Sequence, residues 1–231
     1  MMLIANLRTL LFVAMLLPLQ SYAFFYSAKP IEAWVVDAET KKPLEGVIVV
    51  AHWQLKGGLE GGNPVGQMMV METVTDKNGR FHFSAWGPKL RPWYGELKNQ
   101  SPGILLFKSG YEYRDLYNNR IRKNSRGVLF SEWDKKIIEL GKFKGTEEGY
   151  AEHVYGLGLN IGSMLDFASG DKKCEWKKVP RMLVTLDRIG ADFDNRNIRV
   201  GAWRLGAHIL RIDDIPQHCG SPKEFLGGYA P

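Results

Sequence analysis

Cysteine is scarce in this chain: its 231 residues include two, Cys174 and Cys219. This excludes a cysteine-rich disulfide scaffold, and neither residue belongs to a C-x-x-C arrangement of the kind used for metal binding or redox chemistry. In an oxidising compartment an isolated pair is expected to form one disulfide. Closing a loop of about 45 residues would stabilise the fold by roughly 4 kcal/mol in the chain-entropy model.

The chain also lacks the short motifs that mark the common enzyme classes. It contains no G-x-S-x-G serine nucleophile, no H-x-x-E zinc-ligand pair, and no glycine-rich phosphate loop followed by Lys-Ser or Lys-Thr. The sequence therefore predicts no catalytic residue, no cofactor and no metal site. We expect the protein not to be an enzyme.

Long apolar runs are absent after the first two dozen residues. The one near the start covers residues 10–17, follows Arg8, and is interrupted by Pro18 and Gln20. Ser21 and Ala23 place small residues at the two positions that a signal peptidase reads. Residues 1–23 are therefore predicted to be a cleaved signal peptide. An uncleaved anchor is disfavoured because the run is shorter than the ~20 residues of a membrane span. The protein is therefore predicted to be exported to the periplasm or the extracellular space, with no transmembrane segment after cleavage.

The charge of the chain is modest and dispersed. The formal net charge is +6, and it falls to about +5 when Arg8 leaves with the signal peptide. Short basic pairs such as Lys41-Lys42 and Lys177-Lys178 are typical of a solvated surface, although they also attract anionic envelope polymers or lipid head groups. Nucleic acid is not an expected partner of an exported protein.

Residues 30–143 have the two-residue period of β-strands, with turn residues between the apolar segments. Asn78-Gly79 is predicted to form a tight turn, because both residues tolerate positive φ. The strand at 46–53 is apolar enough to be covered on both faces. The predicted strands cover residues 31–37, 46–53, 68–75, 80–84, 103–108 and 136–140.

Within this half, the chain resembles the carboxypeptidase regulatory-like (transthyretin-like) domain. The family pattern is V-x-D-x-x-T-x-x-P-L-x-G-V-x-V followed by T-D-x-x-G-x-F-x-F. Ala33 departs from it where glycine is common, and the segments 55–67 and 112–134 are longer than the family minimum. The matching residues are Val36, Asp37, Thr40, Pro43, Leu44, Gly46, Val47, Val49, Thr75, Asp76, Gly79, Phe81 and Phe83, and the Gly-Tyr corner after Phe107 is Gly110-Tyr111.

The resemblance implies a prealbumin-like antiparallel β-sandwich of about seven strands. It also implies a non-catalytic role, because in carboxypeptidases the zinc chemistry belongs to a separate, much larger domain. Hydroxyisourate hydrolase shares this fold, but its histidine near the N-terminus and its C-terminal Tyr-Arg-Gly-Ser have no counterpart here; this chain ends in Tyr229-Ala230-Pro231.

Residues 146–231 change to a helical period and form the second predicted region, which contains both cysteines. Thr146 can cap a first helix, and Pro180 fits the first turn of a second that ends at Gly190. Residues 198–212 fit a helix or a strand, and we favour a helix. Ser221 begins a capping box for a last short helix. The fold class is therefore α+β, with the helices packed on the sandwich.

Loop aromatics are the most suggestive functional feature. Aromatic rings beside arginine are typical of interface anchors and of sugar-stacking platforms, although the same rings could plug the ends of the sandwich. We expect a recognition surface in the segments 86–103 and 111–134. Its candidate residues are Trp86, Arg91, Trp93, Tyr94, Tyr113 and Tyr117.

Three functional hypotheses follow. The favoured one is a non-catalytic exported module that binds an envelope protein or a glycan. The second is an enzyme or metal protein that uses His52 and His82, which both lie on predicted strands, although zinc sites normally need a third protein ligand. The third is a structural accessory subunit. Met69 and Met71 suit Cu(I), but core packing explains them equally well.

Overall fold

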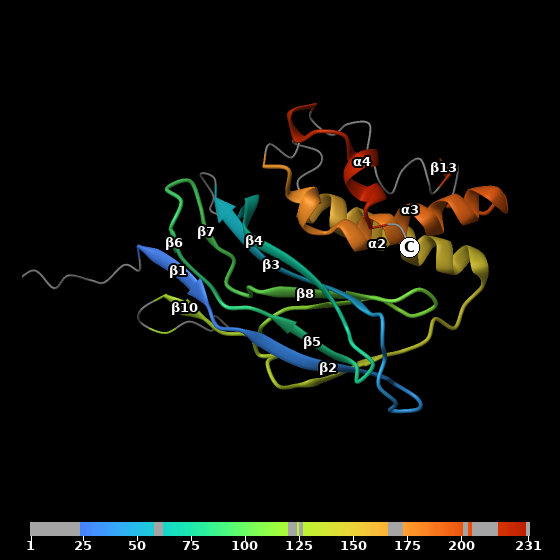
Figure 1. The fold of residues 1–231 in the computed structure, drawn as a ribbon, viewed down its shortest axis with the longest axis horizontal. Coiled ribbons are helices and arrows are strands. Elements are labelled where there is room, and N and C mark those ends of the chain that lie inside the picture. Colours follow the sequence, from blue (N-terminus) through green and yellow to red (C-terminus); the bar gives the residue numbers. More distant parts are fainter. Residues whose placement is uncertain are drawn as a thin grey trace, which may run out of the picture.

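The computed structural model describes residues 24–57, 62–119, 124, 127–165, 173–200, 203–204 and 217–229. The predicted signal peptide lies outside these residues. The described chain forms three layers, in which two β layers face each other and helices cover the outer side of one of them (Figure 1).

The first β layer contains two three-stranded sheets. The chain passes directly from one sheet to the other three times, from β1 to β2, from β5 to β6 and from β10 to β11. In one sheet β2 lies between β5 and β11, and in the other β1 lies between β6 and β10. Each central strand is antiparallel to one neighbour and parallel to the other. The strands are β1 (Phe25–Ala28), β2 (Ile31–Asp37), β5 (Arg80–Phe83), β6 (Trp86–Leu90), β10 (Val128–Leu129) and β11 (Ile137–Leu140).

The second β layer is one antiparallel sheet in the order β4-β3-β8-β9, with β7 paired to the far end of β3. Its strands are β3 (Ile48–Gly57), β4 (Asn63–Val74), β7 (Glu96–Leu97), β8 (Gly103–Phe107) and β9 (Arg114–Leu116).

A hydrophobic core fills the space between the two β layers. Alternate residues of β2 are buried, and so are Phe81 and Phe83 of β5, as their period predicts. From the facing sheet, Val49, Ala51 and Trp53 enter the same core. The predicted sandwich is thus confirmed as an arrangement of facing sheets. Within the described residues eleven strands precede Phe143, against about seven predicted.

Residues of the family-like motif connect the two β layers at one end. The Asp37 carboxylate accepts the backbone N–H of Thr40 at 2.8 Å, and this bond lowers the pKa of Asp37 to about 2. The buried Thr75 hydroxyl donates to the Leu44 carbonyl at 2.6 Å and accepts the N–H of Val47 at 2.9 Å. These side chains serve the fold, because they satisfy backbone groups where the chain crosses between sheets.

Two strand predictions need correction. The segment 55–67, predicted as a long loop, is largely strand, because β3 and β4 continue as a paired hairpin to Gly57 and Asn63. The strand predicted to begin at Met68 therefore begins five residues earlier. Residues 63–66 on the β4 side of this hairpin are all half-buried or exposed, so that segment lacks the alternation that reveals a strand.

The third layer contains the helices, and two of the three α-helices in the described residues begin at the predicted caps. Thr146 accepts the N–H of Gly149 at the start of α2, and Ser221 accepts that of Glu224 at the start of α4. None of the helices in the described part has the length and apolarity of a membrane span. The elements are α2 (Glu147–Met164), the 3-10 turns η2 (Glu175–Lys178) and η4 (Gln217–Cys219), α3 (Pro180–Asn195) and α4 (Pro222–Gly227).

A second hydrophobic core lies between these helices and the sheet of β3 and β8. Val50 and Phe107 point into it from the sheet, and Leu157, Trp176 and Leu186 meet them from the helices. The central sheet is therefore covered on both faces, as predicted from the apolar run at 46–53. The helical layer needs the sheet to bury its apolar stripe, which is why the two regions share one core.

Two predictions for the helical region are wrong. The second helix does not end at Gly190, because it continues to Asn195 and buries Phe193 in the shared core. The preference for a helix after residue 198 also fails where the structure describes the chain, since β12 (Arg199–Val200) pairs with β13 (Trp203–Arg204) in a short hairpin. Residues 205–212 lie outside the described residues.

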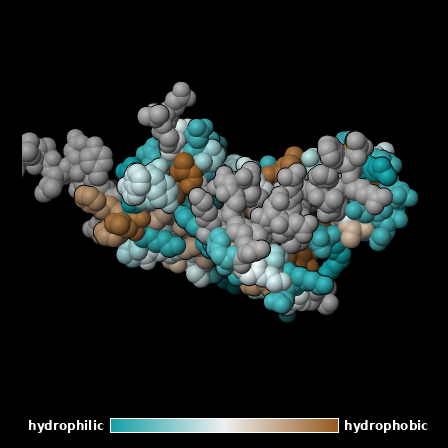
Figure 2. Space-filling model, turned by 90° about the horizontal axis from the view of Figure 1, so that it is seen from above, coloured by the Kyte–Doolittle hydropathy of each residue, from teal (hydrophilic) through white to brown (hydrophobic). Residues whose placement is uncertain are grey.

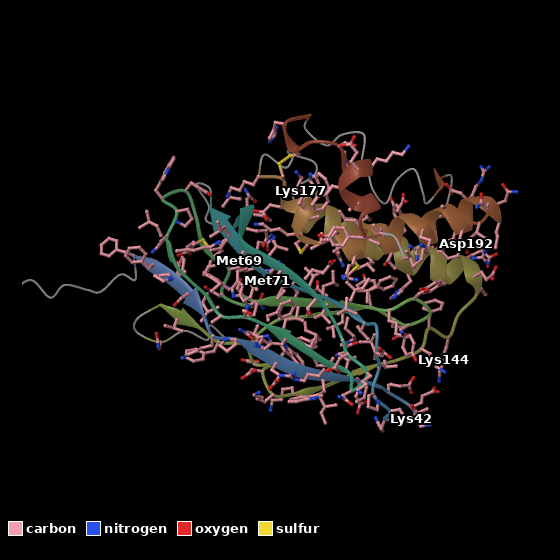
Figure 3. All side chains as sticks on the ribbon, viewed as in Figure 1. Lys42, Met69, Met71, Lys144, Lys177 and Asp192 are labelled. Carbon is pink, nitrogen blue, oxygen red and sulfur yellow. A yellow bond between two sulfur atoms is a disulfide. The ribbon has the colours of Figure 1, made fainter. Side chains whose placement is uncertain are left out.

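The predicted disulfide between Cys174 and Cys219 is present in the structure. It joins the start of η2 to the end of η4, and Figure 3 shows it as a yellow bond near Lys177. His218 lies beside it, with ligand atoms of all three residues within 4.8 Å of one another. Because the two sulfurs are bonded to each other, they do not act as free thiolate ligands for a metal.

A side chain from the sheet caps α3. The Glu72 carboxylate on β4 accepts the backbone N–H groups of Arg181 and Met182 at 3.0 and 2.8 Å. These are among the first N–H groups of the helix, which have no intrahelical partner. Burial raises the pKa of Glu72 to about 7 against the effect of these bonds.

Glu72→Ala is expected to lower the free energy of unfolding by about 1–2 kcal/mol, the usual loss for a helix cap. Glu72→Gln keeps an acceptor oxygen and should lose less than half of that. Urea denaturation followed by circular dichroism measures both variants. If alanine and glutamine cost the same, the hydrogen bonds to α3 contribute nothing to stability.

Candidate functional site

A polar cleft lies at the end of the central sheet where three segments converge. The segments are the β3–β4 hairpin, the connection from β7 to β8, and the residues that follow β9. The cavity between them has a volume of about 580 Å³. Its lining residues are Gln54, Lys56, Gly62, Pro64, Lys98, Asn99, Gln100 and Asn119.

A buried asparagine holds two of these segments together. Asn118 is 1 % exposed, and its side-chain amide donates to the carbonyls of Ser101 at 2.8 Å and Phe130 at 3.0 Å. Its own backbone N–H donates to the Gln100 carbonyl at 3.1 Å. These bonds fix the two loops against each other, so Gln100 and Asn119 face the same cavity.

The β3 strand supplies the opposite wall through a register shift. Trp53 pairs with Met69 but Gln54 pairs with Gln67, so the ladder is irregular at the edge of the cleft. The Gln54 carbonyl accepts the N–H of Lys98 at 2.8 Å, which attaches the β7–β8 connection to the strand. Irregular ladders of this kind re-aim side chains next to binding sites.

A second cavity of about 220 Å³ adjoins the first, because Gln54, Pro64 and Lys98 line both. It lies between the central sheet and the last turn of α2. Its remaining lining residues are His52, Leu105, Asp115, Tyr117, Asn160, Ser163 and Met164.

His52 is a buried, neutral imidazole in this second cavity. Its Nδ1 lies 3.3 Å from the Gln67 Oε1, and the Gln67 amide donates to the Met164 carbonyl at the end of α2 at 2.9 Å. Burial lowers the pKa of His52 to about 4. The chain of bonds links strand β3 to the helical layer and satisfies a carbonyl that α2 leaves unpaired.

Tyr117 and Asp115 complete the polar wall of the cavity. The Tyr117 hydroxyl donates to the Asp115 carboxylate at 3.0 Å, and burial followed by this nearby charge raises the pKa of Tyr117. Burial also raises the pKa of Asp115. The Lys98 ammonium lies 4.7 Å from the centre of the Tyr117 ring. The two cavities thus offer amide, phenol and ammonium groups to a polar ligand.

No protein-family model matches this chain, and no curated protein matches it. Three solved structures that resemble parts of it are a dioxygenase and two pilins. The 3-chlorocatechol 1,2-dioxygenase of Rhodococcus opacus is 16 % identical with a TM-score of 0.31, and the match covers 51 % of this chain and 61 % of that one. The pilus 2b backbone protein of group B streptococcus is 18 % identical, with coverage of 52 % and 42 % and a TM-score of 0.26.

The third structure is the C-terminal domain of a shaft pilin from Lactobacillus rhamnosus GG, 14 % identical with a TM-score of 0.24. Here the match covers 52 % of this chain and 98 % of that domain. This chain therefore spans less than two thirds of the dioxygenase and of the backbone pilin. Identities and TM-scores this low carry no argument about function, so the site is interpreted from its own residues.

The predicted recognition residues divide into four groups in the structure. Trp86 is not on the surface, and its inclusion was wrong: its ring is buried in the sandwich core, 5.3 Å from that of Trp53. Tyr113 packs against His153 of α2 with ring centres 4.5 Å apart, so it forms part of the helix contact. Tyr117 lines the second cavity.

Arg91, Trp93 and Tyr94 lie in the β6–β7 connection and line neither cavity. Trp93 is 96 % exposed, and the Tyr94 hydroxyl accepts a hydrogen bond from the Lys173 ammonium at 3.1 Å. These three residues remain candidates for surface contacts.

The structure does not bring His52 and His82 together. His52 points from β3 toward the helical layer, on the side of the central sheet opposite to Ala51 and Trp53. His82 is exposed on β5, between the inward-facing Phe81 and Phe83. The two imidazoles therefore lie on opposite outer sides of the sandwich, and the hypothesis of a shared metal or catalytic site fails. Met69 and Met71 pack against the sandwich core, and Figure 3 labels both.

Sequence reasoning missed most of the cleft. Lys98, Asn99, Gln100 and Gln54 are polar residues in or beside loops, a composition shared by any solvated surface. The one available signal was the unusual length of the segment 112–134, whose start carries Asn118 and Asn119.

Proposed function

We propose that this protein is a non-catalytic exported binding module whose polar cleft takes an anionic glycan of the cell envelope. The observation that carries the proposal is the lining of the larger cavity, where four side-chain amides and two lysines converge from three segments. Amides pair with sugar hydroxyls because each offers donors and an acceptor. The ammonium group of Lys98 suits a carboxylate or phosphate on the glycan, and Lys56, which also pairs with Glu96, lies on the same wall.

The size and wall of the cleft support a short oligosaccharide. A volume of about 580 Å³ falls within the range of small-molecule sites. Asn118 fixes the loops before any ligand arrives, so little ordering of the backbone is required on binding. The second cavity extends the cleft toward Tyr117, whose phenol adds a polar group with an aromatic face.

Export and family membership belong to the same proposal. The apolar stretch at 10–17 and the single disulfide support an oxidising compartment outside the cytoplasm. Membership of the carboxypeptidase regulatory-like family is supported by the hydrogen bonds of Asp37 and Thr75. Both residues belong to the family motif, and both bond to backbone groups where the chain crosses between the sheets. A structural accessory role is the alternative, and absence of glycan binding would favour it.

Lys98→Ala is expected to weaken binding of trigalacturonate, an anionic oligosaccharide, by about tenfold or more, because a charge-assisted hydrogen bond is lost. Maltotriose, which is neutral, should bind more weakly to the wild type and should respond little to the substitution. Isothermal titration calorimetry measures both sugars on both proteins.

Lys42→Ala is the matched control, since it removes the same charge at the opposite end of the molecule (Figure 3). Its affinity for trigalacturonate should equal that of the wild type. If the wild type binds neither sugar, or if Lys42→Ala and Lys98→Ala weaken binding equally, the cleft is not an anionic-glycan site.

A further inference from the structure

Large apolar side chains gather in solvent at the end of the molecule that carries β1. Of nine such side chains exposed in the described part of the chain, four lie in β1, β6 and their flanking residues. Figure 2 shows brown, hydrophobic surface at this left-hand end. We call the four residues the aromatic tip: Phe24, Phe25, Leu90 and Trp93, which are 72, 51, 67 and 96 % exposed.

Backbone pairing keeps the tip together as one surface. Phe25 is the register partner of Leu90 in the β1–β6 ladder, and the Arg91 N–H donates to the Phe24 carbonyl at 2.8 Å. Trp93 follows Arg91 by two residues, so their Cα atoms lie within about 7 Å of each other. The backbone segments that carry the four side chains therefore lie together at this end of the molecule, with Phe25 and Leu90 as direct neighbours across the ladder.

The exposed side chains of the tip are separate from the sandwich core. Tyr26 and Ala28 of β1 and Trp86 of β6 point inward and are buried, and strand alternation sends Phe25 to the other side. Contiguous apolar surface of this kind is uncommon on soluble proteins and marks contact with a partner or a membrane. The proposed glycan site does not explain this apolar surface, because no tip residue lines either cavity.

Two cationic groups lie beside the tip. Arg91 follows Leu90 directly, and the exposed Lys173 donates to the Tyr94 hydroxyl next to Trp93. The nearby Glu96 carboxylate is shared between Lys56 and Arg91, 3.6 Å from each. Aromatic and aliphatic side chains beside lysine and arginine are the composition of surfaces that rest at an anionic lipid interface.

The sequence places a membrane-directed segment next to the same face. The apolar stretch at 10–17 ends seven residues before Phe24. Seven extended residues span at most about 25 Å, which is less than the thickness of a bilayer with its head groups. Until residues 1–23 are cleaved, the chain holds Phe24 within this distance of any lipid that the stretch occupies.

We propose that the aromatic tip docks on the surface of an anionic bilayer, with its four apolar side chains in the interfacial layer and Arg91 and Lys173 at the head groups. This contact would hold the polar cleft at the membrane face while leaving it open to solvent. No residue of the tip lines the cleft, and the Glu96 carboxylate lies between Lys56 of the cleft and Arg91 beside the tip.

A fluorescent label in place of a tip residue tests the proposal on the full chain. Both native cysteines are in the disulfide, so a nitrobenzoxadiazole label attaches selectively to Leu90→Cys. With vesicles of phosphatidylcholine and phosphatidylglycerol, the label at position 90 should brighten several-fold and be quenched by brominated lipid. With pure phosphatidylcholine the response should be much smaller. Arg91→Gln in the labelled chain should weaken the response about fivefold.

Ile137→Cys is the matched control, because Ile137 is also 67 % exposed. It pairs with Trp34 on β2, beyond β1 along the chain, and lies well away from the tip. Since both labelled chains carry residues 1–23, any attachment through that segment is common to both. Equal responses at positions 90 and 137, or no response at 90, would overturn the proposal. A response at 90 that appears without vesicles and grows with protein concentration would instead assign the tip to contacts between copies of the chain.

Discussion

Replacing both cysteines with serine is expected to lower the free energy of unfolding by about 4 kcal/mol. The disulfide joins residues 45 positions apart, and its main effect in the chain-entropy model is to restrict the unfolded state. A loss of this size is a large share of the stability of an ordinary domain. Urea denaturation followed by tryptophan fluorescence measures the change.

The loss should appear as a lower midpoint of a single transition. Trp176 of η2, close to Cys174, packs in one core with Val50 and Phe107 of the central sheet, so the helices and that sheet are expected to unfold together. Wild-type protein treated with a reductant is the control and should match the double variant. A midpoint that does not move, or two separate transitions, would show that the bond secures only a local segment.

Protonation of His52 is expected to destabilise the protein in acid, against the opposite effect of Glu72, whose raised pKa of about 7 makes the folded chain bind a proton over much of the same range. Burial lowers the pKa of this imidazole to about 4 in the folded state, whereas its ordinary value is 6.5. Between these two values the unfolded chain binds a proton that the folded chain does not, so the free energy of unfolding falls as the pH falls. The difference between the two pKa values corresponds to roughly 3 kcal/mol of the free energy of unfolding. This contribution is fully present above pH 6.5 and is lost by about pH 4.

His52→Asn should remove most of this pH dependence, because asparagine can donate to Gln67 and has no charged form in this range. His82→Asn is the matched control, since His82 occupies an exposed position on another strand. Denaturation curves at intervals from pH 7 to pH 4 compare the slopes of the three proteins. If His52→Asn keeps the wild-type slope, His52 is not the buried neutral group that the structure shows.

The strands were predictable where one face of the sheet is buried. Ile31 to Asp37 alternates between buried and half-buried positions, and the structure gives the strand with those same bounds. The two-residue strand β7 and the outer half of β4 were not predictable, because their pairing depends on neighbours far along the chain. Local alternation needs one dry face, and these segments have none that is continuous.

The helices show the same division. Thr146 and Ser221 cap their helices through bonds three residues away, which the sequence displays directly. The cap of α3 is Glu72, more than a hundred residues earlier, and no local pattern announces it. Gly190 was taken for a helix end, although it is buried within α3, where a small residue allows close packing.

The candidate site was the least predictable part of the protein. Loop aromatics indicated a recognition surface, but the same pattern describes Trp86, which fills the core, and Trp93, which stands in solvent. Whether a loop ring faces inward depends on the register of the strand before it and on the opposite sheet. The amides of the cleft carried no signal, because polar residues in loops are expected with or without a ligand.

The sequence by itself determined the alternating strands, the helical second region and the caps of α2 and α4, because each follows from the short steric period of the backbone or from bonds between near neighbours. It also determined the disulfide pair, because two cysteines allow only one pairing. The tertiary structure alone decided that Lys98, Gln100 and Asn119 enclose one cleft, that His52 and His82 point to opposite sides, and that Phe25 meets Leu90. These outcomes depend on strand register and on packing between distant segments. Many sequences with the same local pattern would bring other residues together at these places.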